Sequence, residues 1–217
     1  MSLDVQFAAT LFADAPVIAG AWLRPLTLGH ALLLTRLESP LMPGNDREVT
    51  VADLALALEV CRRPWPGAVG AMQRGRRARA WLAWRAVRLH WLEPEALLAE
   101  TQRMLTWLQG QWRGPNTLHT ATEGEGSDAP VLASLLAACM SELGLSETGA
   151  LALPVVRAQW LLALQAERAG HLRIMGDAYQ SVFAEAKAME ARWRAEQGAG
   201  SGERGARSQE QGETHNG

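Results

Sequence analysis

Apolar residues recur at helical spacing in two consecutive segments near the start of the chain. The first segment follows Thr27, whose side chain is placed to cap a helix, and ends at Pro40. The second follows Thr50, with Asp53 three residues later in a variant of the capping box, and ends at Pro64. The apolar positions are Leu28, Leu32, Leu33 and Leu37 in the first segment, and Leu54, Leu58 and Cys61 in the second. We therefore expect two helices in succession.

The same periodicity predicts further helices along the rest of the chain. One covers residues 76–91, and the next covers residues 93–110, with a proline at its first helical position. Three more are expected over residues 130–144, 154–170 and 171–196. Neither a fixed-period repeat nor an alternation of strands and helices is present, so the predicted fold class is all-α, with about four helices before a linker and three after it.

Two stretches lack this periodicity and divide the chain. Residues 113–129 contain a single leucine among polar residues and glycines, which predicts an exposed, flexible linker. Residues 197–217 hold no aliphatic residue larger than alanine, which predicts a disordered tail. We therefore expect an N-terminal helical unit over residues 1–112 and a C-terminal helical unit over residues 130–196. Within the first unit, the pattern of residues 1–25 is compatible with either a short strand or a first helical turn.

Composition and charge narrow the class of protein only slightly. The chain has 217 residues and a formal net charge of −2, which gives no overall attraction to nucleic acid or anionic lipid. Its least polar stretch, residues 5–23, carries Asp14 and Pro16 near the middle, so we expect no membrane span. Cys61 and Cys139 lie far apart in apolar helical contexts. They are predicted to be buried free thiols of a protein in a reducing cytoplasm.

No arrangement of residues predicts catalysis, a metal site or a cofactor. The glycines of residues 198–205 superficially resemble a phosphate-binding loop, but they follow a predicted helix end rather than a strand, and they enter the predicted tail. The histidines are isolated from one another and from cysteines at the spacing that metal ligands need. They are His30, His90, His119, His171 and His215. We therefore expect a protein that is not an enzyme.

The most distinctive chemistry lies in "RRARAWLAWRAVRLHW", residues 76–91, with five arginines, three tryptophans and no acidic residue. On a helix the three tryptophans fall on one face, and two of the arginines project into or beside that stripe. Stacking of guanidinium groups on the indoles is geometrically available there. The candidate partner-binding residues are Trp81, Trp84, Arg85, Arg88 and Trp91.

Four interpretations of this helix are open from the residues alone. It can face the core, with the arginine stems covering apolar area while their charged ends reach water. It can dock a protein, because tryptophan and arginine are enriched at binding hot spots. It can bind single-stranded nucleic acid by stacking and phosphate contacts, or lie in a membrane interface. The acidic remainder of the chain disfavours the last two.

The order of the leucine-rich segments carries a resemblance to a known class. The stretch "LRPLTLGHALLLTRLESPL" (23–41) is followed by "VADLALALEVCRRPW" (51–65) and later by "LALPVVRAQWLLALQAERAG" (151–170). This order resembles small cytoplasmic proteins encoded in the tail gene clusters of tailed bacteriophages and prophages. Among them it is most similar to the tail assembly chaperones.

That resemblance implies a soluble helical protein, without cofactor, in the cytoplasm of the bacterial host. It implies a protein partner, the tape-measure protein or another tail protein, which the chaperone coats until tube subunits replace it. Grooves between helices and exposed apolar side chains would serve such a client. The alternative is a nucleic-acid-associated protein that uses the helix of residues 76–91.

Overall fold

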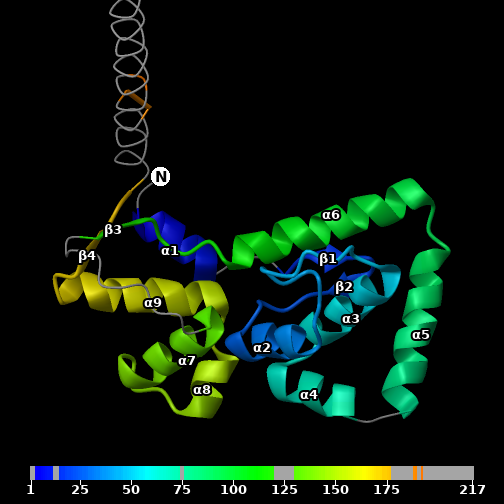
Figure 1. Cartoon of the computed structure of the whole chain (residues 1–217). Coiled ribbons are helices and arrows are strands. Elements are labelled where there is room, and N and C mark those ends of the chain that lie inside the picture. Colours follow the sequence, from blue (N-terminus) through cyan, green and yellow to red (C-terminus); the bar gives the residue numbers. More distant parts are fainter. Residues whose placement is uncertain are drawn as a thin grey trace, which may run out of the picture. The chain divides into compact units, whose positions relative to one another are not determined.

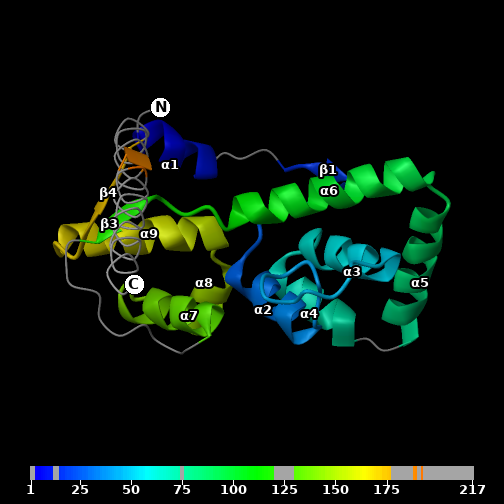
Figure 2. The ribbon, with the colours of Figure 1, turned by 45° about the horizontal axis from the view of Figure 1, so that its top comes forward.

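The computed structural model describes residues 3–11, 15–73, 76–119 and 130–176, together with residues 188, 189 and 192. These residues are mostly helical, with two small two-stranded sheets, which confirms the predicted all-α class (Figures 1 and 2). Residues 4–174 form one compact unit, and the remaining residues belong to a second. No helix of the described residues is long and apolar enough to cross a membrane.

The helices lie in the following order along the chain. They are α1 (Leu3–Leu11), α2 (Leu28–Arg36), α3 (Val51–Cys61), α4 (Trp65–Gln73), α5 (Arg76–His90), α6 (Pro94–Gln111), α7 (Val131–Ser141), α8 (Glu147–Ala152) and α9 (Val155–Arg168). The strands are β1 (Val17–Ile18), β2 (Ala21–Trp22), β3 (Thr117–His119) and β4 (Leu172–Ile174).

The two predicted capping residues begin α2 and α3 as expected. The Thr27 hydroxyl accepts the backbone N–H of His30, and the Thr50 hydroxyl accepts that of Asp53. Both helices complete the reciprocal box, because the third-residue side chain accepts the N–H of the capping residue. His30 is an unusual partner in this position. Its Nε2 lies 2.9 Å from the carbonyl oxygen of Arg63, so the ring is neutral and donates its Nε2–H there.

Helix α2 lies at the centre of the unit of residues 4–174. It packs against α3 and α4 on one side and against α7 and α8 on the other (Figures 1 and 2). The backbone N–H of Leu28 donates to the carbonyl of Leu153, and that of Val155 donates to the carbonyl of Leu26. The helices before and after the predicted linker therefore share one compact unit.

Two expectations about the C-terminal half need correction. The first residues of the predicted flexible linker 113–129 are ordered, because β3 pairs with β4 in an antiparallel sheet. The same pairing shows that the helix predicted from residue 171 is wrong at its start. Gly170, with φ of +79°, ends the preceding helix and lets the chain turn back as a strand. The end of the linker, residues 120–129, and the predicted tail, residues 197–217, lie outside the described residues.

The ambiguous stretch of residues 1–25 contains both a helix and strands. After α1, strands β1 and β2 form a hairpin in which Ile18 pairs with Ala21. The two residues between them, Ala19 and Gly20, have φ of +46° and +71°. Positive φ at both positions is what a two-residue hairpin turn of this kind requires, and it is costly for the alanine. The hairpin lies beside α6 (Figure 1).

A glycine in α2 allows α4 to approach closely. A Cβ at Gly29 would lie 2.3 Å from Cδ2 of Trp65, far inside van der Waals contact. We expect Gly29→Ala to lower the free energy of unfolding by about 2 kcal/mol, because overpacking outweighs the better helix propensity of alanine. Denaturant titration checks this. The control is Gly70→Ala in α4, where the added Cβ meets open space. Stabilisation by both substitutions would contradict this account of α2–α4 packing.

The neutral, buried His30 makes stability depend on pH. Burial lowers the pKa of His30, and the nearby Arg24 charge acts in the same direction. The unfolded chain therefore takes up the proton more readily, and stability falls as the pH drops from about 7 to about 5. We expect His30→Gln to flatten this part of the profile, because glutamine can cap the helix without titrating. His90→Gln, at an exposed position, is the control, and an equally flattened profile in both variants would contradict this account of His30.

Candidate functional site

Helix α5 packs along α3 with a face other than the tryptophan stripe. Its buried residues are Leu89 and Arg85, the latter only 8% exposed. The tryptophans face outward instead: Trp81 is 37% exposed, Trp84 55% and Trp91 84%. The interpretation that the stripe is packed into the core is therefore wrong for Trp84 and Trp91. The apolar inner face comes from leucine and alanine spaced at three or four residues, which is enough to hold the helix.

A single buried carboxylate attaches α5 to α3. Glu59, near the C-terminal end of α3, is only 3% exposed. Its Oε2 lies 2.6 Å from Nε of Arg62 and 3.5 Å from Nη1 of Arg85, while Nε of Arg63 donates to Oε1 at 2.8 Å. These four residues are called the Glu59 cluster below. Because three guanidinium groups share one carboxylate, the cluster keeps an excess of positive charge.

The charge states within the cluster follow from these contacts. Burial alone would raise the pKa of Glu59, but hydrogen bonds and charges of Arg62 and Arg63 hold that pKa below its usual value. Burial and the neighbouring Arg62 lower the pKa of Arg85, and Glu59 opposes that effect. Arginine stays protonated in proteins. The cluster is therefore fully charged at neutral pH.

Guanidinium groups also cover the faces of two tryptophans. Cζ of Arg62 lies 4.5 Å from the centre of the Trp81 ring, and Cζ of Arg85 lies 5.5 Å from it. Cζ of Arg88 lies 5.8 Å from the centre of the Trp84 ring. The two indoles meet edge to face, with ring centres 5.3 Å apart and planes at 77°. The stacking expected from the sequence is therefore present, and it places both rings in a defined arrangement.

These residues line one side of a cavity of about 700 Å³, which we name the tryptophan–arginine pocket. The β1–β2 hairpin, the end of α3, α5 and the start of α6 surround it. Its lining includes Trp22, Arg62, Trp81, Trp84, Arg85, Arg88, Leu89, Leu92 and Glu100. Four of the five residues predicted from the sequence are thus brought together. The fifth, Trp91, does not line the pocket; it directly follows α5 and is strongly exposed.

The opposite wall of the pocket could not be predicted from the sequence. Trp22, 71% exposed, belongs to β2 in the stretch that was ambiguous. Its hairpin is fixed by Glu100 of α6, whose Oε2 accepts the backbone N–H of Ala19 at 2.7 Å. The other oxygen of Glu100 accepts Nη1 of Arg103 at 2.9 Å. The strained turn at Ala19 thus lies at the pocket, where a carboxylate holds it in place.

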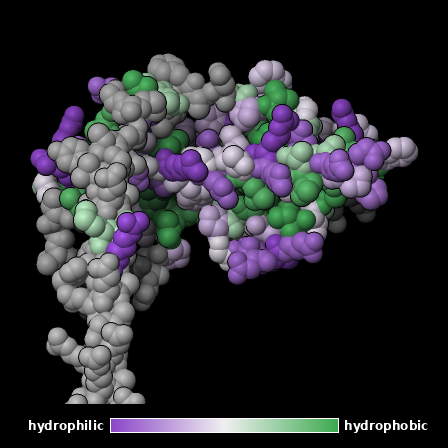
Figure 3. Space-filling model, turned by 90° about the horizontal axis from the view of Figure 1, so that it is seen from above, coloured by the Kyte–Doolittle hydropathy of each residue, from purple (hydrophilic) through white to green (hydrophobic). Residues whose placement is uncertain are grey.

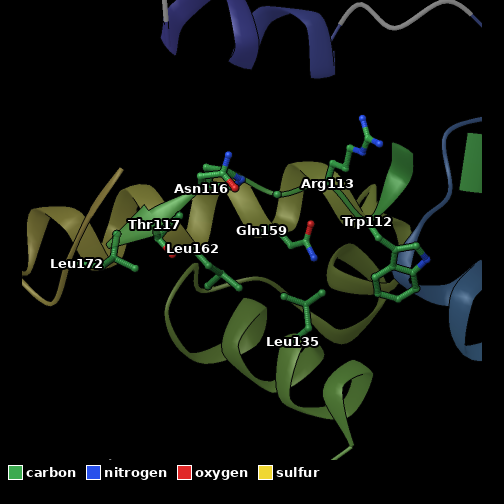
Figure 4. Close-up of a pocket in the computed structure, with 11 residues that line it drawn as sticks. Trp112, Arg113, Asn116, Thr117, Leu135, Gln159, Leu162 and Leu172 are labelled. Atoms are coloured by element: carbon green, nitrogen blue, oxygen red, sulfur yellow. The ribbon is translucent and has the colours of Figure 1, made fainter. Parts of the chain in front are cut away.

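A second cavity, of about 790 Å³, lies between α7, α9 and the segment that follows α6 (Figure 4). Leu135 of α7 and Leu162 of α9 face it, whereas the side chains of Arg113 and Asn116 point away. Buried Oε1 of Gln159 has no hydrogen-bond partner among the described residues. Because Arg113 points away from this cavity whereas three arginines line the tryptophan–arginine pocket, the latter carries the more specific chemistry.

Within the described residues, neither a metal-binding cluster nor a reactive cysteine is found. Within them, no group of three or more histidine, cysteine or acidic side chains could hold a metal ion. Cys61 and Cys139 are buried and unbridged, and burial raises the pKa of the Cys61 thiol to about 12. Such thiols are poor nucleophiles at neutral pH.

The surface that carries α6 in Figure 1 is chemically mixed. Figure 3 looks onto this side, and apolar and hydrophilic side chains alternate over short distances on its described part. Exposed large side chains also occur at Trp84 and Val87 of α5, at Trp91 and Leu92 between the helices, and at Leu98 of α6. Exposed aromatic residues interspersed with charge are typical of protein-docking surfaces.

Loss of the central carboxylate should uncouple α5 from α3. Glu59→Gln leaves Arg62, Arg63 and Arg85 without a counter-charge, so we expect the free energy of unfolding to fall by about 3 kcal/mol. Glu48→Gln, at an exposed loop position, makes the same chemical change and should have almost no effect. Denaturant titration of both variants measures the difference. Equal stability of the two variants would show that the Glu59 cluster does not hold these helices together.

Comparison with known proteins leaves the geometry of the site as the basis for its function. No protein-family model, no curated protein and no solved structure matches this chain.

Proposed function

We propose that this chain acts by binding another protein, without catalysis, through α5 and the tryptophan–arginine pocket beside it. The single observation that carries the proposal is the exposure of Trp84 on α5 and of Trp91 directly after it, although α5 is already anchored by another face. Folding does not require these indoles to be buried, because Leu89 and Arg85 of α5 already supply the buried contacts. Large exposed aromatic side chains are the residues that most often anchor protein interfaces.

The pocket supports the same proposal. It places three tryptophans and three arginines around one cavity, and cation–π and edge-to-face contacts orient the rings of Trp81 and Trp84. Pre-arranged side chains lose little freedom on binding, which favours affinity. A helical client with an apolar stripe could lay that stripe across Trp84 and Trp91 and insert a side chain into the cavity.

The more specific part of the proposal names the client. The resemblance of residues 23–41 and 51–65 to tail assembly chaperones points to a tail protein of a bacteriophage or prophage, and first to the tape-measure protein. A tape-measure protein is a long helical chain with apolar faces, which suits a surface of exposed indoles. In this role the chain would work in the cytoplasm of the bacterial host.

Binding to nucleic acid is the rival function, and the charges disfavour it. Arg62 and Arg85 are already paired with Glu59, and Glu100 adds a negative charge to the pocket lining. A phosphate backbone needs a continuous basic path. Salt dependence separates the two functions: phosphate binding should weaken steeply as salt is added, and apolar docking should change little.

Co-expression tests the proposed function. We expect a tape-measure protein encoded beside this chain to remain in the soluble fraction when both are produced together. The double substitution Trp84→Ala and Trp91→Ala should return most of the client to the pellet, because it removes two anchors of the docking face. Met140→Ala, an exposed apolar change in α7, should leave the client soluble. A client that precipitates equally with and without this chain would end the chaperone proposal.

A further inference from the structure

We propose that the tryptophan–arginine pocket selects an acidic side chain that lies next to an apolar one on a helical partner. This inference rests on the proposed function and adds the chemistry of the partner segment to it. The occupant is an amphipathic helix whose apolar stripe is flanked by glutamate or aspartate. The inference is based on the position of exposed indoles beside a guanidinium group that has no carboxylate partner.

The charges around the pocket are unequal in favour of cations. Arg62, Arg85 and Arg88 line it, against the single carboxylate of Glu100. That carboxylate is already occupied by the backbone N–H of Ala19 and by an arginine of α6. The pocket therefore presents guanidinium N–H donors without an available acceptor. A carboxylate of the partner would supply that acceptor.

The arginines differ in how free they are to bind. Arg85 is buried, and Arg62 is tied to Glu59, so both are committed to the fold. Arg88 is exposed, and among the described residues it takes part in no ion pair; its recorded contact is with the ring of Trp84. A guanidinium group that rests on an indole keeps its N–H groups directed outward for a planar acceptor. Arg88 is therefore the expected direct partner of the incoming carboxylate.

The apolar part of the pocket suits the neighbouring side chain of the same helix. Trp22, Trp84 and Leu92 are exposed around the cavity, and its volume of about 700 Å³ is large enough for a leucine or phenylalanine. On a helix, an acidic residue three or four positions from an apolar one lies on the same face. One helical turn of the partner could thus reach both Arg88 and the indoles.

A nucleic acid would bring the same negative charge, but the geometry favours the peptide. Bases need open aromatic faces on which to stack. Arg62 lies over one face of Trp81 and Arg88 over one face of Trp84, while the two rings stand edge to face, so this pair forms no flat stacking platform. A partner with one carboxylate beside an aliphatic group uses the space that remains.

Three short amphipathic helices with an identical apolar stripe test this inference, with flanking residues of glutamate, glutamine or lysine. Binding to the full-length protein is followed by isothermal titration calorimetry. We expect the glutamate peptide to bind about tenfold more tightly than the glutamine peptide, as one charge-assisted contact would give. A single-stranded oligothymidine is titrated alongside. Tighter binding of the oligothymidine than of the glutamate peptide would overturn the inference in favour of nucleic acid.

Charge reversal at one position identifies the residue responsible. Arg88→Gln should remove the preference for the glutamate peptide, and Arg88→Glu should shift it to the lysine peptide. Arg157→Gln, which removes an exposed arginine of α9, should preserve it. Circular dichroism confirms that each variant keeps its helix content.

The two levels of the proposal fail in different ways. Equal binding of the three peptides, with the client still held soluble, would overturn the charge selection and leave the docking function standing. An unchanged preference in Arg88→Glu would equally overturn the assignment of Arg88. A client that precipitates regardless of this chain would remove the docking function itself.

Discussion

The arrangement of the proposed binding surface depends on one buried carboxylate. Glu59 is the meeting point of α3 with α5, because it accepts hydrogen bonds from Arg62 and Arg63 of its own segment and from Arg85 of the neighbouring helix. Three cations around one anion would repel one another in its absence, so the position of α5 is coupled to the ionisation of this group. The inner face of α5 can then be held by leucine and alanine, and its tryptophans remain outside.

This anchoring gives a physical reason for the exposed indoles. A helix whose tryptophans were its main packing residues could not offer them to a partner without losing its own contacts. In this chain, the residues of α5 that pack against α3 and the exposed tryptophans lie on different faces of the helix. The hairpin of β1 and β2 adds Trp22 from a distant part of the chain, held by Glu100, and converts a helix face into a pocket. Specificity for a partner can therefore depend on charge as well as on apolar area.

The sequence was sufficient where the controlling interactions are local. Thr27 and Thr50 cap α2 and α3 through contacts three residues away, and Pro94 opens α6, so helix starts could be read directly. The pairing of Glu59 with Arg62 and Arg63 was also visible in principle, since the two arginines follow this carboxylate at spacings of three and four residues.

The features that the sequence did not predict depend on contacts between residues that are distant in the chain. The strand pairing of β3 with β4 joins segments more than fifty residues apart. The wall formed by Trp22 requires Glu100 to accept the N–H of Ala19, which no periodicity can show. The outward direction of the tryptophans was likewise undetermined, because a stripe of tryptophan and a stripe of leucine on one helix are equally apolar. Which of the two stripes is buried depends on the side chains of α3 that pack against α5.

The central claim is that Trp84 and Trp91 are open to solvent in the free chain and become covered by a protein partner. Hydroxyl-radical footprinting with mass spectrometry measures this directly, residue by residue, in the free chain and in its complex with the tape-measure protein. The account predicts rapid oxidation of both indoles in the free chain and strong protection in the complex, while the buried Trp160 reacts slowly in both states. Slow oxidation of Trp84 and Trp91 in the free chain, or unchanged rates in the complex, would contradict it.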